Sequence, residues 1–185
     1  KRDYKINGRL KLLFVGALDL RKGACVMFDA LQQLCERGLD WELHVLGPAE
    51  FAQRVMPKEL TGRIVFHGFL PQDELKRFYT MADVFVFPTY AEGSARCAME
   101  AMGAGLPVIT TYHCGAPITH GKSGIYVGVG NSGELTDAIV ELAEDESLRS
   151  LIGEHAANLI RERYTWACYG ENLSKFYREV CGECE

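Results

Sequence analysis

Two glutamates, Glu92 and Glu100, are separated by seven residues in a segment that also contains Gly93 and Ser94. Carboxylates accept hydrogen bonds and donate none, so a pair of them suits the hydroxyl groups of a sugar. Gly93 permits a tight turn, and Ser94 is of a type that caps a helix and leaves N–H groups facing a diphosphate. The segment therefore favours a phosphorylated, hydroxyl-rich ligand. An acid at a helix start followed by a chance acid would give the same pattern.

The surroundings of Glu100 favour the functional reading. Its neighbours along the chain are mostly apolar, namely Met99, Ala101, Met102 and Ala104. Burying an unpaired carboxylate among apolar side chains is costly. We therefore expect Glu100 to be retained for a purpose.

A second loop, from Gly16 to Gly23, contains the basic residues Arg21 and Lys22 just before a predicted helix. A phosphate bound there would meet free backbone N–H groups, the positive end of a helix dipole and a mobile cation. A solvated basic turn would look the same. On this loop alone, the two interpretations remain open.

Hydrophobic periodicity places these loops between strands and helices. Apolar runs predict strands at 11–16, 42–46, 63–67, 84–87, 107–110 and 124–127. Helical spacing and punctuation predict helices at 22–37, 48–58, 72–81, 95–103, 133–143, 147–163 and 165–180. Such alternation predicts an α/β fold with a parallel sheet covered on both faces. Ligands of open sheets bind beyond the carboxyl ends of the strands, where the loops described above are expected to lie.

A competing motif is the segment from Gly128 to Gly133, which matches the GxGxxG pattern of dinucleotide-binding proteins. That fingerprint needs a further strand after the helix, ending in an acidic residue about 20 positions on. Only helices are predicted after Gly133. We therefore interpret the match as a loop followed by a helix cap.

Composition narrows the classes of partner. The 185 residues are 48% hydrophobic and 24% charged, with a formal net charge of −5, which argues against a dedicated nucleic-acid binder. No apolar run approaches the ~20 residues of a membrane-spanning helix, and no leader sequence opens the chain. Seven scattered cysteines predict reduced thiols and a cytoplasmic location. The pair Cys181 and Cys184 lacks a second pair, and is interpreted as incidental rather than as half of a zinc site.

The ordered motifs resemble the C-terminal domain of family 4 retaining glycosyltransferases, the glycosyl transferases group 1 domain of the GT-B fold. The resemblance runs from about residue 11 to residue 180. It rests on the segments FVGALDLRKG, HGFLPQDELKRFYTMADVFVFPTYAEG, MEAMGAGLPVITT, GKSGIYV and YTWACYGENLSKFY. It implies a Rossmann-like domain with a roughly six-stranded parallel sheet flanked by helices, and a helical C-terminal tail.

The resemblance also implies roles for individual residues. Glu92 would contact the donor sugar and Glu100 the ribose hydroxyls. Lys22 would pair with the diphosphate, so that Glu92 and Lys22 are the expected catalytic residues. The remaining expected donor-binding residues are Gly16, Arg21, His67, Gly68, Phe69, Gly93, Ser94, Ala95 and Arg96. The stretch from His67 to Phe69 would border the base. The family needs no metal, no cofactor is expected, and the sequence contains no DxD pair.

Three departures from the family pattern bear on the site. Ala17 stands where an arginine often follows the first-loop glycine, and Arg96 stands at a position that is usually apolar. We hypothesise that Arg96 or Arg21 supplies part of the missing positive charge. The loop after Gly115 also lacks an acidic residue common in relatives, so the loop does not predict which sugar is bound.

The resemblance suggests a divided protein. Residues 1–10 would be the remnant of an interdomain linker, residues 11–180 the donor-binding domain, and residues 181–185 a tail. The acceptor would bind through an N-terminal domain that this sequence lacks. The chain alone is thus expected to bind a nucleoside diphosphate weakly and to transfer no sugar. A non-catalytic nucleotide-sugar-binding module and an epimerase of the same architecture remain alternatives, and peripheral membrane association of the full-length protein is left open.

Overall fold

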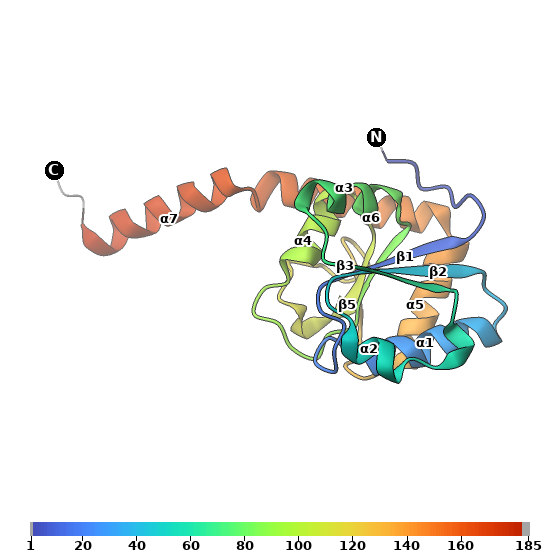
Figure 1. Cartoon of the computed structure of the whole chain (residues 1–185). Helices are drawn as coiled ribbons and strands as arrows, with labels where there is room; N and C mark the ends of the chain where they lie inside the picture. The colour runs from blue at the N-terminus through green and yellow to red at the C-terminus, as the bar shows by residue number, and fades with distance from the viewer. Residues whose placement is uncertain (1, 183–185) are drawn as a thin grey trace.

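A six-stranded parallel sheet with the order β3-β2-β1-β4-β5-β6 forms the centre of the computed structural model, which describes residues 2–182 (Figure 1). All five strand pairs are parallel. The strands are β1 (Leu10–Val15), β2 (Trp41–Leu46), β3 (Ile64–Gly68), β4 (Val84–Phe87), β5 (Val108–Thr111) and β6 (Ile125–Val127). The order reverses between β1 and β4, which opens a crevice at their carboxyl ends. The prediction of an α/β, Rossmann-like domain is confirmed.

Helices cover both faces of the sheet, and each predicted strand is found within a few residues of its expected place. The helices are α1 (Ala24–Glu36), α2 (Glu50–Val55), α3 (Gln72–Met81), α4 (Arg96–Gly103), α5 (Ser132–Glu144), α6 (Glu146–Arg163) and α7 (Trp166–Cys181), with 3₁₀ turns η1 (Lys58–Leu60) and η2 (Tyr112–Cys114). In Figure 1, α1, α2 and α5 lie on one side of the sheet and α3, α4 and α6 on the other. The helix predicted at 48–58 is divided into α2 and η1.

The core of the sheet is built from strands whose buried residues follow one another without alternating with exposed ones. Every residue of β4 and β5 is buried, as expected for parallel strands that helices cover on both faces. The aromatic rings of Phe14 and Phe87 stack with centroids 5.4 Å apart, and those of Phe85 and Phe87 with centroids 5.9 Å apart. The strands that carry the site therefore have little freedom to shift.

The GxGxxG match is part of a helix cap, as interpreted from the sequence. Asn131 caps α5 by accepting a hydrogen bond from the Glu134 backbone N–H at 3.0 Å. The Glu134 carboxylate in turn accepts from the Gly128 N–H at 2.7 Å. β6 is the edge strand of the sheet, and only helices follow it within the described residues. A dinucleotide fingerprint has no place there.

The segment before β1 is attached to the domain, although it is predicted to be the remnant of a linker. Arg2 donates hydrogen bonds to the carbonyls of Tyr79, Ala82 and Ala104, near the ends of α3 and α4. The Tyr4 hydroxyl donates to the Gly105 carbonyl at 3.0 Å. Lys1 lies outside the described residues. The segment from Arg2 onward therefore contributes to the folded unit, whatever precedes it.

The last helix projects from the body. α7 has no buried residue, and Figure 1 shows it extending well beyond the sheet and its covering helices. Cys181 ends α7, whereas Cys184 lies outside the described residues. The prediction for this cysteine pair therefore stays untested.

Candidate functional site

Lys22, Arg21 and Glu92 meet beyond the carboxyl ends of β1 and β4. The Arg21 guanidinium donates to Glu92 Oε1 at 2.5 Å and to the Ala91 carbonyl at 2.8 Å. Lys22 Nζ lies 3.8 Å from the same Glu92 oxygen and 5.3 Å from the centroid of the Phe87 ring. Two cations thus share one carboxylate oxygen, which leaves this cluster with a net formal charge of +1. Such a cluster can accept an added anion.

Glycines bring the Lys22 ammonium close to the strand ends. A Cβ atom on Gly16 would lie 2.7 Å from Lys22 Nζ, and one on Gly47 would lie 2.5 Å from the Gly16 carbonyl oxygen. The Gly47 N–H donates to the Gly68 carbonyl at 2.7 Å. The ends of β1, β2 and β3 therefore meet without side chains between them, which leaves backbone accessible to a ligand. Gly16 and Gly68 were predicted as site residues; Gly47 was not, and its place directly after an apolar run was the available signal.

The loop that carries Glu92 rests on η2. The Glu92 N–H donates to the His113 carbonyl at 2.9 Å, and the Ala95 N–H donates to the Cys114 carbonyl at 3.0 Å. Gly115 adopts a left-handed φ of 69° directly after η2, where a Cβ atom would lie 2.6 Å from the Gly93 carbonyl oxygen. This close backbone contact holds the loop that carries Glu92 in place beyond the end of β4. The sequence did not indicate it.

The start of α4 differs from the prediction in its cap. Ala95 occupies the N-cap position, no side chain caps the helix, and Ser94 is exposed. The predicted Ser94 cap is therefore wrong, because the Ala95–Cys114 backbone hydrogen bond sets where the helix begins. The backbone amides of Arg96 and Cys97 donate to no acceptor in the described chain. An uncapped helix start still offers donors to an anion.

Glu100 lies on the exposed side of α4, one turn after Arg96. Its side chain is 41% exposed, so the expectation that it is buried among apolar neighbours is wrong. Of those neighbours, Ala101 and Met102 face inward, whereas Met99 is partly exposed and Ala104 is exposed. Glu100 Oε2 accepts a hydrogen bond from the Tyr79 hydroxyl at 3.0 Å, and Oε1 lies 3.8 Å from the Arg96 guanidinium.

Of the two arginines considered as a replacement for the absent first-loop arginine, only Arg21 joins the Lys22–Glu92 cluster. The Arg96 side chain is 74% exposed and pairs with Glu100. Arg21 instead contacts Glu92 directly.

The segment from His67 to Phe69 forms a separate group at the end of β3. His67 Nε2 lies 2.9 Å from His44 Nδ1, and the His67 ring packs against Phe78 with centroids 4.5 Å apart. Burial, the neighbouring His44 and Arg77 lower the pKa of His67. Phe69 is 88% exposed. Gly68 connects this group to the glycines beneath Lys22, but His67 and Phe69 make no direct contact with Lys22 or Glu92 among the contacts described.

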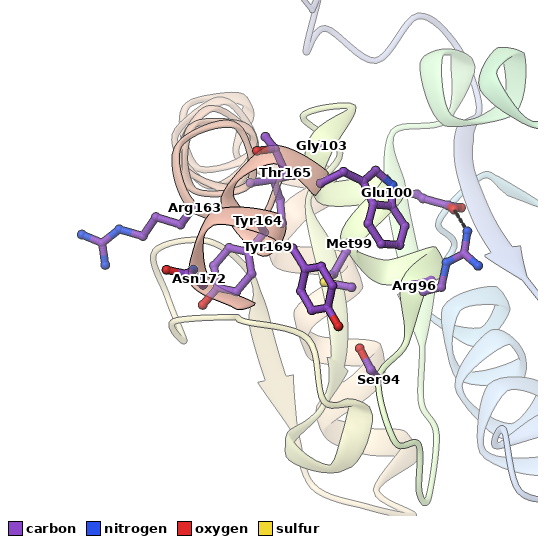
Figure 2. Close-up of a pocket in the computed structure, with 12 residues that line it drawn as sticks. Ser94, Arg96, Met99, Glu100, Gly103, Arg163, Tyr164, Thr165, Tyr169 and Asn172 are labelled. Atoms are coloured by element: carbon purple, nitrogen blue, oxygen red, sulfur yellow. Dashed lines mark ion pairs between the residues drawn. The ribbon is translucent and has the colours of Figure 1, made fainter. Parts of the chain in front are cut away.

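A pocket of about 710 Å³ adjoins the site between α4 and the junction of α6 with α7. Figure 2 shows Ser94, Arg96, Met99 and Glu100 on one side of it, and Tyr164 and Tyr169 on the other. Burial raises the pKa of the neighbouring Cys97 thiol to about 12, so this cysteine remains protonated at neutral pH. The pocket is continuous with predicted donor-binding residues.

The described residues contain no group of three or more His, Cys, Asp or Glu side chains arranged to hold a metal ion. Within the same residues, no helix is long and apolar enough to cross a membrane.

This sheet order and this arrangement of loops agree with the family comparison. The model of the family described as glycosyl transferases group 1 matches residues 9–145. The chain belongs to this family. The match covers the sheet, the Lys22 loop and the segment that contains both glutamates.

Similar proteins support the assignment. A D-inositol 3-phosphate glycosyltransferase of Corynebacterium diphtheriae is 34% identical over 91% of this chain and 42% of its own length. The C-terminal domain of LpcC, a glycosyl transferase group 1 family protein of Francisella tularensis, is 26% identical. It has a TM-score of 0.75 and is matched over 85% of this chain and 87% of its own. HepE of Anabaena, solved with UDP-glucose, shares the fold with a TM-score of 0.77 at 23% identity, over 93% of this chain and 49% of its own.

In the curated relatives, the glycosyl transferases group 1 domain is one part of a longer chain. The chain spans about half or less of the length of the curated relatives that it matches, for example 46% and 42% in two D-inositol 3-phosphate glycosyltransferases. The solved LpcC domain, in contrast, is matched over 87% of its length. The present domain therefore corresponds to a C-terminal domain that has been studied on its own.

Proposed function

We propose that this chain is the donor-binding domain of a retaining glycosyltransferase, which transfers a sugar from a nucleoside-diphosphate sugar to an acceptor without a metal ion. The observation that carries the proposal is the cluster of Lys22, Arg21 and Glu92 beside the uncapped start of α4. The complex of HepE with UDP-glucose supports it, because that protein shares this fold.

The cluster has the chemistry that departure of a nucleoside diphosphate requires. When the bond between the sugar C1 and the diphosphate oxygen breaks, negative charge develops on the leaving phosphate. Lys22, Arg21 and the free amides of α4 would stabilise that charge, since preorganised donors and cations act strongly where charge develops. A phosphate would compete with Glu92 for the two cations. Glu92 would then be free to accept hydrogen bonds from the hydroxyl groups of the sugar.

Binding of the donor is tested by calorimetric titration of the chain with UDP, GDP and ADP. We expect one of the three to bind, and Lys22→Ala to weaken its affinity at least tenfold by removing a charge-assisted contact. The matched control is Lys76→Ala, because Lys76 is an exposed lysine of α3 that, among the described residues, pairs only with Asp73. If no nucleoside diphosphate binds, or if Lys22→Ala and Lys76→Ala behave alike, the proposed donor site is wrong.

Transfer is tested with the full-length protein. We expect transfer from the nucleoside-diphosphate sugar of the base that binds, with EDTA leaving the rate unchanged and the anomeric configuration retained. The acceptor would bind through the N-terminal domain, so the present chain should show no transfer by itself. Binding without transfer by the full-length protein would make the domain a non-catalytic nucleotide-sugar-binding module.

A further inference from the structure

Tyr79 lies in the last turns of α3, beneath the outer surface of α4. Its side chain is buried, with its ring centroid 6.2 Å from that of Phe85 in β4. Its hydroxyl lies 3.0 Å from Glu100 Oε2 and 3.3 Å from the Cys97 carbonyl oxygen. A phenol has one proton to donate. The carboxylate is the nearer of the two acceptors and the charged one, so it receives the stronger hydrogen bond.

The Tyr79 hydroxyl keeps its proton over a wide pH range. Burial and the charge of Glu100 both raise the pKa of Tyr79 far above its ordinary value. The hydroxyl therefore stays protonated and remains a donor, while Glu100 is the acceptor.

The Tyr79 hydroxyl donates to Glu100 Oε2 from the buried side of the helix, and Glu100 Oε1 points toward solvent. Oε1 is approached only by Arg96 at 3.8 Å among the described charged groups, and the side chain is 41% exposed. A free glutamate on a helix surface samples several rotamers, and binding must order it at a cost in conformational entropy. The hydrogen bond from Tyr79 removes part of that freedom before any ligand arrives.

We propose that Tyr79 is a positioning residue for donor binding, which orients Glu100 so that its carboxylate meets the ribose hydroxyls of the nucleotide. The inference rests on the proposed function and on the role that the family resemblance implies for Glu100, contact with the ribose hydroxyls. It makes Tyr79 a part of the site although it is too buried to touch the ligand itself. A purely structural link between α3 and α4 is the competing explanation.

The test combines a variant with an altered ligand. Tyr79→Phe keeps the buried ring and removes only the hydroxyl. Calorimetry measures binding of UDP, GDP or ADP, whichever the wild type binds, and of its 2′,3′-dideoxy counterpart. We expect Tyr79→Phe to weaken binding of the nucleoside diphosphate about fivefold, consistent with the loss of one hydrogen bond. Binding of the dideoxy compound should stay within twofold, because that ligand has no ribose hydroxyls for Glu100 to meet.

Two controls separate the explanations. Tyr126→Phe removes a hydroxyl that donates to the Ile118 carbonyl at 3.2 Å, away from Glu100, and should leave both affinities unchanged. In a Glu100→Ala background, Tyr79→Phe should have no further effect on nucleotide binding. An equal loss for both ligands, or a loss that persists without Glu100, would overturn the positioning role. Failure of the wild type to bind any of the three nucleotides would instead overturn the proposed function.

Discussion

At the residue scale, the contact of Arg21 with Glu92 explains why an arginine stands at this place in the loop. The loop lacks a different arginine, which relatives often carry directly after the first glycine. Ala17 stands at that position, and Arg21, four residues later, extends to Glu92. Arg21 and Lys22 approach the same carboxylate oxygen from neighbouring positions in the chain. An arginine that contacts Glu92 can also contact a phosphate that displaces it.

We therefore expect Arg21→Ala to weaken nucleoside diphosphate binding about tenfold, because it removes a charge-assisted hydrogen-bond donor. Arg96→Ala should change the affinity less than threefold, since Arg96 is largely exposed and pairs with Glu100. Calorimetric titration of both variants distinguishes the two arginines. A larger loss for Arg96→Ala would show that Arg96, and not Arg21, supplies the missing charge.

His67 predicts how stability depends on pH. Its pKa is lowered in the native state, first by burial and then by His44 and Arg77, whereas the unfolded chain keeps the ordinary value of about 6.5. As the pH falls below ~6.5, the unfolded state takes up a proton that native His67 does not, so the free energy of unfolding decreases until the lowered native pKa is reached. Above that range, His67 has no effect on the pH dependence.

Urea unfolding between pH 8 and pH 5 measures this effect. His67→Asn should lessen the loss of stability below pH 6.5, because asparagine does not titrate. His113→Asn serves as the control, since His113 is an exposed residue of η2. Equal pH dependence in the wild type and His67→Asn would contradict the assignment.

At the element scale, the entry into α1 determines where Lys22 stands. Helical spacing predicts a helix from residue 22, but α1 begins at Ala24 because Gly23 adopts a left-handed φ of 80°. A Cβ atom on Gly23 would lie 2.1 Å from the Pro88 carbonyl oxygen. The Lys22 loop thus packs directly on the chain leaving β4, which joins the two predicted halves of the site.

Gly23→Ala should destabilise the protein by about 3 kcal/mol or more, since it combines a left-handed conformation with a backbone clash. Gly38→Ala is the matched control. Gly38 has a φ of 75°, but a Cβ atom there would meet nothing within 4 Å, so the cost is expected to be only about 1 kcal/mol. Thermal or urea unfolding compares the two. Equal losses would show that the contact with Pro88 yields without cost.

At the scale of the whole molecule, Arg149 of α6 ties the N-terminal segment to the end of α5. The buried Arg149 side chain donates to the carbonyls of Tyr4, Leu142 and Ala143 at distances from 2.5 to 3.1 Å. Arg2 and Tyr4 add contacts with the ends of α3 and α4. These interactions make residues before β1 a part of the domain.

Arg149→Met should lower the free energy of unfolding by about 3 kcal/mol, because it leaves buried carbonyl groups without donors. It should also expose the segment before β1 to proteolysis. Arg161→Met on the same helix is the control, since Arg161 is exposed and contacts Asn158 alone among the described contacts. Unchanged stability of Arg149→Met would mean that water replaces the guanidinium at no cost.

The sequence by itself determined the order of strands and helices, the parallel sheet, the family and the loops that hold its chemistry. Apolar runs and helical spacing are local properties of the chain, so the strand at 84–87 and the helix at 72–81 could be predicted without a structure. Predictions from local patterns were wrong where contacts between residues distant in the chain decide the structure. Ser94 does not cap α4, because the Cys114 carbonyl holds the preceding backbone.

Only the tertiary structure decided which charged groups share a site. It placed Arg21 on Glu92 and Arg96 on Glu100, and showed that Glu100 is exposed and held by Tyr79 from a different helix. The Arg21–Glu92 and Tyr79–Glu100 pairings join residues 71 and 21 positions apart, and the spacing of residue types along the chain carries no information about these two. The Arg21–Glu92 pairing follows from the adjacency of the parallel strands β1 and β4 at the centre of the sheet, which brings the loops after them to one edge.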